Sequence, residues 1–216
     1  MDFVAERLRL VLRLKSEGLI TTPEVERAML SVPRENFVWP GTEAHAYIDA
    51  PLPLSDTGQT ISAPHMVAIM LEELDLKPGM SVLEIGTGSG YNAALLAELV
   101  GSEGKVVSLE INAKLVDFAM SNLEKTGYGK RVQIIHSDGS HGYPPGQVNI
   151  YDRICVTAAA PEVPKALLEQ LRPGGILLIP IGSSYNQRLV KMVKNEEGKF
   201  ERESLGWVSF VPLRMG

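Results

Sequence analysis

Residues 81–90, Ser-Val-Leu-Glu-Ile-Gly-Thr-Gly-Ser-Gly, constrain the fold of this chain more than any other stretch. The first five form a short, mostly apolar run that is typical of a buried strand, and apolar residues recur at helical spacing over residues 91–100. Between them, glycines stand at positions 86, 88 and 90, and a residue without a Cβ allows a tight turn and a close approach of the backbone to a ligand. A strand, a glycine-rich turn and a helix in this order predict a nucleotide-binding βα unit. The alternative, an ordinary turn between a strand and a helix, would need only one glycine.

The spacing of the glycines indicates which cofactor the turn binds. The dinucleotide fingerprint G-x-G-x-x-G would require a glycine at position 91, where this chain has Tyr91. The sequence instead reads G-x-G-x-G, and an acid, Glu84, stands two positions before the first glycine. This pattern resembles motif I of the S-adenosylmethionine-dependent methyltransferases. Their cofactor has no pyrophosphate to place at the helix N-terminus, so the third dinucleotide glycine is not needed.

Composition limits the classes of protein that fit. The chain has 216 residues, 44% of them hydrophobic, which is enough for one well-cored domain with additions. Its formal net charge of -5 differs from the basic balance of a nucleic-acid-binding domain. Charged residues interrupt the N-terminal segment, unlike a secretory signal, and no apolar run approaches the roughly 18 residues of a membrane span. We expect a cytoplasmic α/β protein with no nucleic-acid or membrane partner, in which the one cysteine, Cys155, is a buried core residue.

Helix-like and strand-like segments alternate along the middle of the chain. We predict helices over residues 2–16, 22–31, 64–74, 91–100, 113–126 and 164–171, and strands over 81–85, 105–109, 132–135, 151–156 and 176–181. Residues 188–194 and 199–203 predict a hairpin, and residues 207–213 a last strand. The alternation predicts a Rossmann-like, doubly wound, mostly parallel α/β sheet with right-handed crossovers and antiparallel C-terminal strands. The first two helices are expected to cap one edge of this sheet.

Three further places along the chain have residues that could contact a ligand: the loop before residue 64 and the ends of the second and third strands. Residues 33–63 are loop-like, and a loop of this length is unusual in a compact domain unless it is functional. At its end, Ser62 lies close to a helix N-terminus, where free N–H groups favour an anion. Glu110 ends the second strand, where an acid in nucleotide-binding folds accepts hydrogen bonds from ribose hydroxyls; the alternative is a solvated glutamate. Asp138 and Gly139 follow the third strand, and could face an adenine edge or form a plain turn.

Beyond the glycine turn, several motifs closely resemble those of the protein-L-isoaspartate O-methyltransferase family. The most specific is Gly-Gln-Thr-Ile-Ser-Ala-Pro-His-Met over residues 58–66. The others are Tyr-Ile-Asp at 47–49, Asp-Gly at 138–139, Tyr-Asp at 151–152, Val-Thr-Ala at 156–158 and Phe-Val-Pro-Leu at 210–213. They cover nearly the whole chain in order, and the ending is similar to the shorter archaeal or bacterial form. Arg153 departs from the family, whose members often carry a small or apolar residue there, and this affects only the expected local packing.

The resemblance implies an activity and its residues. The family uses S-adenosylmethionine to methylate the α-carboxylate of L-isoaspartyl residues in damaged proteins and peptides, which starts their repair through a succinimide. By resemblance, Ser62 is the active-site serine. The implied cofactor-binding residues are Gln59, Thr60, Ile61, Glu84 (near the methionine amino group), Gly86, Gly88, Ser89, Glu110, Ile111, Asp138 and Gly139. The implied substrate-binding residues are Ser62, Ala63, His65, Val211 and Pro212, with no metal and no catalytic role for His65.

The reacting groups explain why few catalytic side chains are expected. The nucleophile is a carboxylate with an unperturbed pKa of roughly 4, so it is ionised at pH 7 without a general base. Ser62 therefore need only orient it, whereas a nucleophilic serine would need a histidine held by an acid. A sulfonium and a carboxylate become a neutral thioether and a neutral ester, so a dry pocket favours the transfer. We predict that no lysine or arginine contacts the substrate carboxylate, because such a clamp would stabilise the ground state.

The domain organisation and the alternatives follow from the same residues. We expect one methyltransferase domain over residues 1–216, acting as a monomer. It comprises N-terminal helices and the active-site loop (1–63), a cofactor-binding core (64–181) and a C-terminal hairpin and strand (182–216). A methyltransferase acting on another small-molecule or protein substrate is the alternative. The 33–66 segment disfavours a small molecule or RNA, and the acidic balance also disfavours RNA. A nicotinamide-dependent oxidoreductase is disfavoured by Tyr91, and a non-catalytic binding module by the intact set of Glu84, Glu110 and Ser62.

Overall fold

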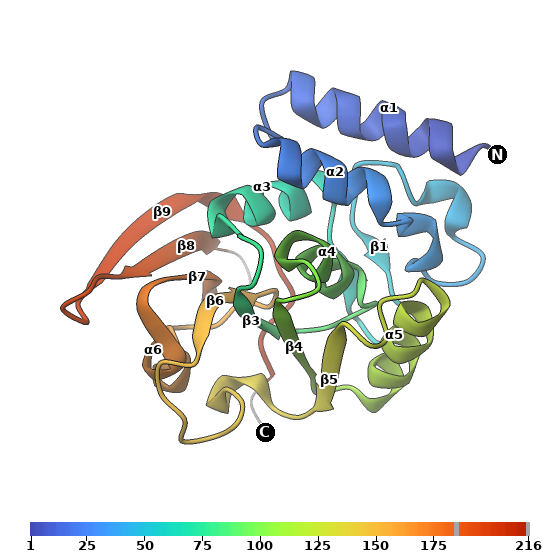
Figure 1. Ribbon diagram of the computed structural model, residues 1–216. Helices are drawn as coiled ribbons and strands as arrows, with labels where there is room; N and C mark the ends of the chain where they lie inside the picture. Colours follow the sequence, from blue (N-terminus) through green and yellow to red (C-terminus); the bar gives the residue numbers. More distant parts are fainter. Residues whose placement is uncertain (184–185, 215–216) are drawn as a thin grey trace.

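The computed structural model describes residues 1–183 and 186–214, and its centre is a seven-stranded sheet (Figure 1). The strand order is β5-β4-β3-β6-β7-β8-β9. The first five strands are parallel, and β8 and β9 run antiparallel, as the sequence predicts. The strands are β3 (Ser81–Ile85), β4 (Lys105–Glu110), β5 (Val132–His136), β6 (Tyr151–Val156), β7 (Leu171–Ser183), β8 (Asn186–Lys194) and β9 (Phe200–Val208).

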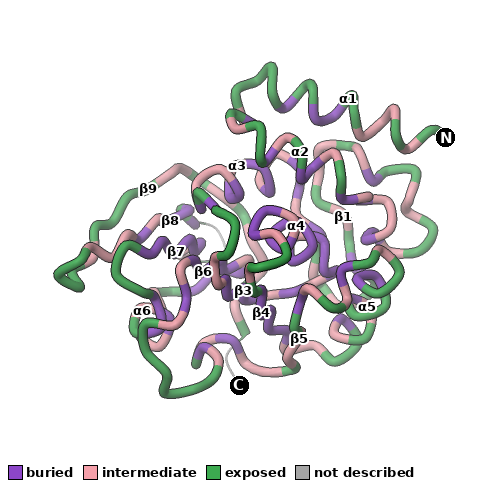
Figure 2. The backbone as a smooth tube through the Cα atoms, in the orientation of Figure 1, coloured by how far each residue is buried: buried purple, intermediate pink, exposed green. Residues whose placement is uncertain are grey.

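Helices cover both faces of the sheet. One face carries α3 (Pro64–Leu74), α4 (Tyr91–Val100) and α5 (Ala113–Lys125), and the other carries α6 (Lys165–Gln170) and the 3-10 turn η3 (Gly139–His141). Successive strand residues point to opposite faces, so Val82 and Val106 join the core under α3, α4 and α5. Their neighbours Leu83 and Val107 join the second core, with Leu167 of α6. Figure 2 shows both cores as buried strands at the centre, with β9 exposed at one edge.

The two N-terminal helices form a further layer above α3 and α4. The side chain of Asp2 accepts hydrogen bonds at the start of α1 (Phe3–Ser16), and Thr22 caps α2 (Pro23–Ser31). Helix α2 packs on α4 and α3, and α1 packs on α2 (Figure 1). The expectation that these helices cap an edge of the sheet is wrong. Val25 and Met29 of α2 are buried against the helices that cover one face of the sheet.

The segment before α3 contains more local structure than its sequence predicts. It holds two 3-10 turns, η1 (Arg34–Asn36) and η2 (Glu43–His45), and a small antiparallel pair, β1 (Leu52–Pro53) and β2 (Thr60–Ile61). The guanidinium of Arg34 is fully buried and donates to the carbonyl oxygens of Ala46 and Ser62, both at 2.8 Å. Arg34 of η1 therefore links the backbone at Ala46 to the backbone at Ser62. Ser62 directly precedes Ala63, the N-cap of α3.

The predicted last strand over residues 207–213 is wrong. Strand β9 continues to Val208, and the chain then leaves the sheet, keeping one bridge between Pro212 and Ala159. The side chain of Gln187 takes the place of a strand partner, accepting from Phe210 N at 2.6 Å and donating to Phe210 O at 3.0 Å. Residues 209–214 thereby cross the carboxyl end of β6, where Val211 O accepts from Ala159 N at 2.8 Å.

Two remaining expectations concern buried residues and membrane spans. Arg153 is buried, and its guanidinium donates to the carbonyl oxygens of Leu74, Asp75 and Asp152, which stabilises the C-terminus of α3. Cys155 is a buried free thiol, as predicted, and burial raises its pKa. Among the helices of the described residues, none has the length and apolar content to cross a bilayer.

Candidate active site

Two open pockets meet at the carboxyl ends of the parallel strands. The first, about 870 Å³ in volume, lies over the glycine turn, and we call it the glycine-loop pocket. The second, about 960 Å³, lies between the start of α3 and residues 207–211, and we call it the Trp207 pocket. Four residues line both, namely Thr60, Ser62, Thr157 and Val211. A molecule in one pocket can therefore contact a molecule in the other across these four side chains.

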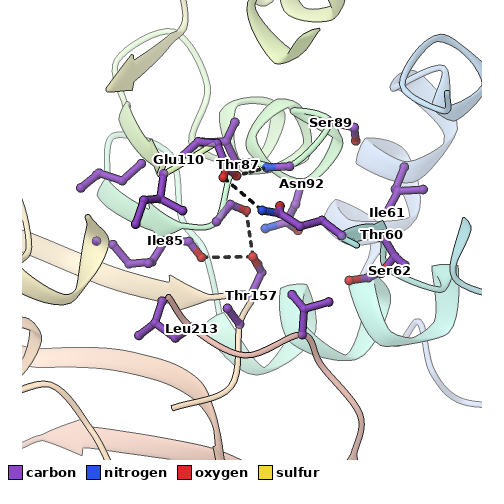
Figure 3. A pocket seen from close by; sticks show the side chains of 18 of the residues that line it. Thr60, Ile61, Ser62, Ile85, Thr87, Ser89, Asn92, Glu110, Thr157 and Leu213 are labelled. Carbon is purple, nitrogen blue, oxygen red and sulfur yellow. Dashed lines mark hydrogen bonds between the residues drawn. The ribbon is translucent and has the colours of Figure 1, made fainter. Parts of the chain in front are cut away.

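The floor of the glycine-loop pocket is the turn between β3 and α4. Gly86 has a φ of +96°, and a Cβ at this position would lie 2.4 Å from Thr157 Oγ1. The hydroxyl of Thr157 donates to Gly86 O at 2.8 Å, which holds the turn against the loop after β6 (Figure 3). Gly90, with a φ of +86°, packs against Ala119 and Leu123 of α5. The glycines at 86 and 90 are therefore needed both for conformation and for close packing.

Glu110 is the carboxylate in the wall of this pocket. It is almost fully buried, and the backbone holds it in place: Gly88 N donates to Oε2 and Asn112 N donates to Oε1, both at 2.9 Å. Gln59 reaches Oε1 from the covering loop at 3.5 Å, a long contact that another donor can replace (Figure 3). Ile111 follows Glu110 in the wall. The site thus presents a fixed acceptor next to an apolar surface.

Glu84 lies beneath the pocket and does not line it. Its carboxylate is fully buried and accepts hydrogen bonds from Asn92 Nδ2 at 2.8 Å and from Ser108 Oγ. Burial raises the pKa of this carboxyl to about 7, although both hydrogen bonds act in the opposite direction. Asn92 does line the pocket. Glu84 therefore lies behind Asn92, whose amide donates to it at the pocket wall, and its role near the methionine amino group stays a prediction.

The structure divides the other predicted residues between the two pockets. Gln59, Ile61, Gly86, Gly88, Ser89, Ile111, Gly139 and Pro212 line the glycine-loop pocket only, and Ala63 and His65 line the Trp207 pocket only. Pro212 therefore lies on the side of the glycine loop and not with the predicted substrate residues. Asp138 lines neither pocket, because its carboxylate accepts from Ser140 N at 2.8 Å and begins η3. Gly139 is in the wall, where a Cβ would lie 2.3 Å from Ile85 Cγ2.

Several polar residues of the site are not among the predicted ones, and two of them could have been found from the sequence. Asn92 is a polar residue in the first turn of a mostly apolar helix, and this isolated polarity was a usable signal. Thr157 is the one polar residue between Val156 and Pro161, at the carboxyl end of a central strand where α/β folds place their ligands. Both positions could have been found by asking why a hydroxyl or an amide interrupts an apolar run.

Ser62 lies where the two pockets join. Its carbonyl oxygen is held by Arg34, while its hydroxyl has no hydrogen-bond partner within the part of the chain that the structure describes (Figure 3). The described lining of the Trp207 pocket contains no lysine or arginine, and Arg214 lines the glycine-loop pocket. Within residues 1–183 and 186–214, no three His, Cys, Asp or Glu side chains gather where they could hold a metal ion. The junction therefore offers a hydroxyl without a hydrogen-bond partner among the described residues, beside a pocket whose described lining has no lysine or arginine.

Comparisons with known proteins agree on one family. The family model described as protein-L-isoaspartate(D-aspartate) O-methyltransferase (PCMT) matches residues 5–216. A protein-L-isoaspartate O-methyltransferase of Methanopyrus kandleri is 53% identical over 211 residues, covering 98% of this chain and 92% of that one. One from Pyrococcus horikoshii is 54% identical over 206 residues, covering 95% and 91%. A solved Plasmodium falciparum structure, described as a protein-L-isoaspartate O-methyltransferase in complex with S-adenosyl-L-homocysteine, has a TM-score of 0.85 at 32% identity and covers 95% of this chain and 97% of that one.

Proposed function

The chain belongs to the protein-L-isoaspartate(D-aspartate) O-methyltransferase family, and we propose that it transfers the methyl group of S-adenosylmethionine to the α-carboxylate of L-isoaspartyl residues. Its substrates are damaged proteins and peptides that contain such residues. The methyl ester closes to a succinimide, which partly hydrolyses to a normal aspartyl residue. The observation that carries the proposal for the site is the junction of the two pockets at Ser62, where a methyl donor on one side can face a carboxylate on the other.

The glycine-loop pocket fits the cofactor. A carboxylate with two oxygens suits the two neighbouring hydroxyls of a ribose, and Glu110 is held at the wall by two backbone N–H groups. Gln59 would yield its long contact with Glu110 to these hydroxyls. Ile111 and Gly139 provide the surface for the adenine, and Gly86 and Asn92 face the methionine end. When bound, the cofactor supplies a methyl group on a positively charged sulfur.

The Trp207 pocket would hold the isoaspartyl segment. The hydroxyl of Ser62 orients the α-carboxylate by donating one neutral hydrogen bond, and the carboxylate needs no base because it is already ionised at pH 7. The described lining includes the apolar side chains of Met66, Trp207 and Phe210, and a bound peptide would displace water from them as the two charges disappear. The described lining of this pocket has no lysine or arginine to clamp the carboxylate, so the ionised reactants are not over-stabilised. Positioning then carries most of the rate, and it contributes about 7–11 kcal/mol in favourable cases.

We also propose that the protein acts as a cytoplasmic monomer and that residues 1–216 work as one methyltransferase domain. The chain has one cysteine, which is buried as a thiol, in keeping with a reducing compartment. The net charge of -5 supports a protein substrate over a nucleic acid.

The experiment that tests the function uses two synthetic peptides that differ only in one L-isoaspartyl or L-aspartyl residue. Each is incubated with the protein and methyl-labelled S-adenosylmethionine, and base-labile methyl ester is counted. We expect label in the isoaspartyl peptide alone. Label in neither peptide, with S-adenosylhomocysteine binding intact by calorimetry, would retain the cofactor and refute the proposed substrate. Binding of a nicotinamide dinucleotide in place of S-adenosylhomocysteine would refute the methyltransferase as well.

A further inference from the structure

His65 is the one ionisable side chain among the described residues that line the Trp207 pocket, and the resemblance implies that it binds substrate without saying which atoms it contacts. It lies in the first turn of α3, three residues after Ser62. Its side chain is 39% exposed, so part of the ring faces the pocket. A histidine at this place can contact the bound peptide but is not needed as a base.

Asp49 holds one edge of this histidine. Asp49 Oδ1 lies 2.9 Å from His65 Nδ1 and also accepts from the backbone N of His65 at 2.9 Å. The other oxygen, Oδ2, pairs with Arg13 of α1 at 3.3 Å. An ionised carboxylate is an acceptor only, so the ring nitrogen facing it must carry the proton. In the neutral ring the second nitrogen, Nε2, is then unprotonated.

The second ring nitrogen is free for a ligand. Across residues 1–183 and 186–214, nothing hydrogen-bonds His65 Nε2. An unprotonated imidazole nitrogen accepts a hydrogen bond, and it would repel the α-carboxylate of the substrate. The donors that an extended peptide offers on either side of its isoaspartyl residue are backbone N–H groups. The chemistry therefore matches the peptide backbone and not the reacting carboxylate.

We propose that Asp49 is a positioning residue that keeps His65 in the Nδ1–H tautomer, so that Nε2 accepts a hydrogen bond from a backbone N–H of the isoaspartyl substrate. The inference rests on the proposed function, because the ligand is the substrate of that reaction. It gives the Tyr-Ile-Asp motif at residues 47–49 a task in substrate binding. It also makes the affinity for the substrate depend on the tautomer of His65.

The test compares Asp49→Ala with the wild type by two measurements. Nitrogen-15 NMR of the imidazole at pH 8 reports which ring nitrogen carries the proton. We expect the Nδ1–H form of His65 in the wild type and a shift toward Nε2–H in Asp49→Ala, which a purely structural role of Asp49 would not require. Steady-state kinetics with the isoaspartyl peptide should show KM raised about tenfold, as for the loss of one hydrogen bond. S-adenosylhomocysteine affinity should stay within about twofold of the wild type, which also verifies that the variant is folded.

Arg13→Gln is the matched control. It removes the ion pair at Oδ2 but leaves both contacts between Asp49 and His65, so the tautomer and KM should remain those of the wild type. Asp49→Glu offers a rescue, because a carboxylate is restored. The inference is overturned by an Nε2–H ring in the wild type, or by an unchanged KM in Asp49→Ala despite a changed tautomer. Methylation by the wild type distinguishes the two failures. Where it is observed, these outcomes overturn the inference alone; where it is absent, the proposed function is refuted and the substrate contact with it.

Discussion

Replacing Glu84 by glutamine tests the electrostatics beneath the cofactor pocket. Glutamine preserves the hydrogen bonds: its carbonyl oxygen can accept from Asn92 Nδ2, and its amide can donate to Ser108 Oγ. Ser108 can then direct its own proton to Thr87 Oγ1, which lies 2.6 Å away. The change removes the titration and leaves the shape, so any pH-dependent effect on stability comes from the buried carboxyl.

The sign follows from the raised pKa of Glu84. Between pH 4.5 and about 7 the folded protein keeps a proton on this carboxyl that the unfolded chain has released. Folding takes up a proton in this window, so the free energy of unfolding of the wild type falls as the pH rises. The stability that the folded protein gains from keeping Glu84 protonated is fully present below pH 4.5 and is lost as the pH rises through about 7. A rise in the pKa of Glu84 from 4.5 to about 7 corresponds to about 3 kcal/mol of unfolding free energy, since one pKa unit is about 1.4 kcal/mol.

The assay is urea unfolding of both proteins, without cofactor, at intervals from pH 4.5 to 8.5. The unfolding free energy of Glu84→Gln minus that of the wild type should grow by about 3 kcal/mol across the window and level off near pH 8. Glu201→Gln, on the exposed strand β9, controls for the loss of one carboxylate at the surface. A difference that stays constant with pH would show that the buried carboxyl is ionised throughout, and the reasoning about its burial would be refuted.

Three further substitutions probe the site. Ser62→Ala should lower kcat at least about tenfold and change S-adenosylhomocysteine affinity less than about twofold, because the hydroxyl orients the substrate; equal losses in kinetics and calorimetry would mean that Ser62 mainly holds the cofactor loop. Gly86→Ala should destabilise the protein by about 1–3 kcal/mol in urea unfolding, because φ is +96° and the new Cβ would meet Thr157 Oγ1; wild-type stability would contradict the tight turn. Glu110→Gln should weaken S-adenosylhomocysteine binding by about 10- to 100-fold in calorimetry, since a charged acceptor for the ribose is lost; unchanged affinity would remove Glu110 from the cofactor site.

Local pattern was enough to predict the central βα unit. The strand before Gly86 and the helix after it depend on apolar periodicity and on residues without a Cβ, which neighbours in the chain decide. The place of Glu110 at a strand end follows from counting along the same unit. The resemblance of residues 58–66 to a known family added the substrate, which periodicity cannot supply.

Which residues come together, and how deeply each is buried, depends on contacts between distant parts of the chain. The sequence places Glu84 two residues before the turn, but its depth depends on Asn92 and Ser108, which pack over it from another helix and another strand. Residues 209–213 have the composition of a strand, yet Gln187 and Ala159 draw them off the sheet to close the site. The physical reason is that burial and hydrogen bonding depend on partners distant along the chain, whereas periodicity reports only on neighbours.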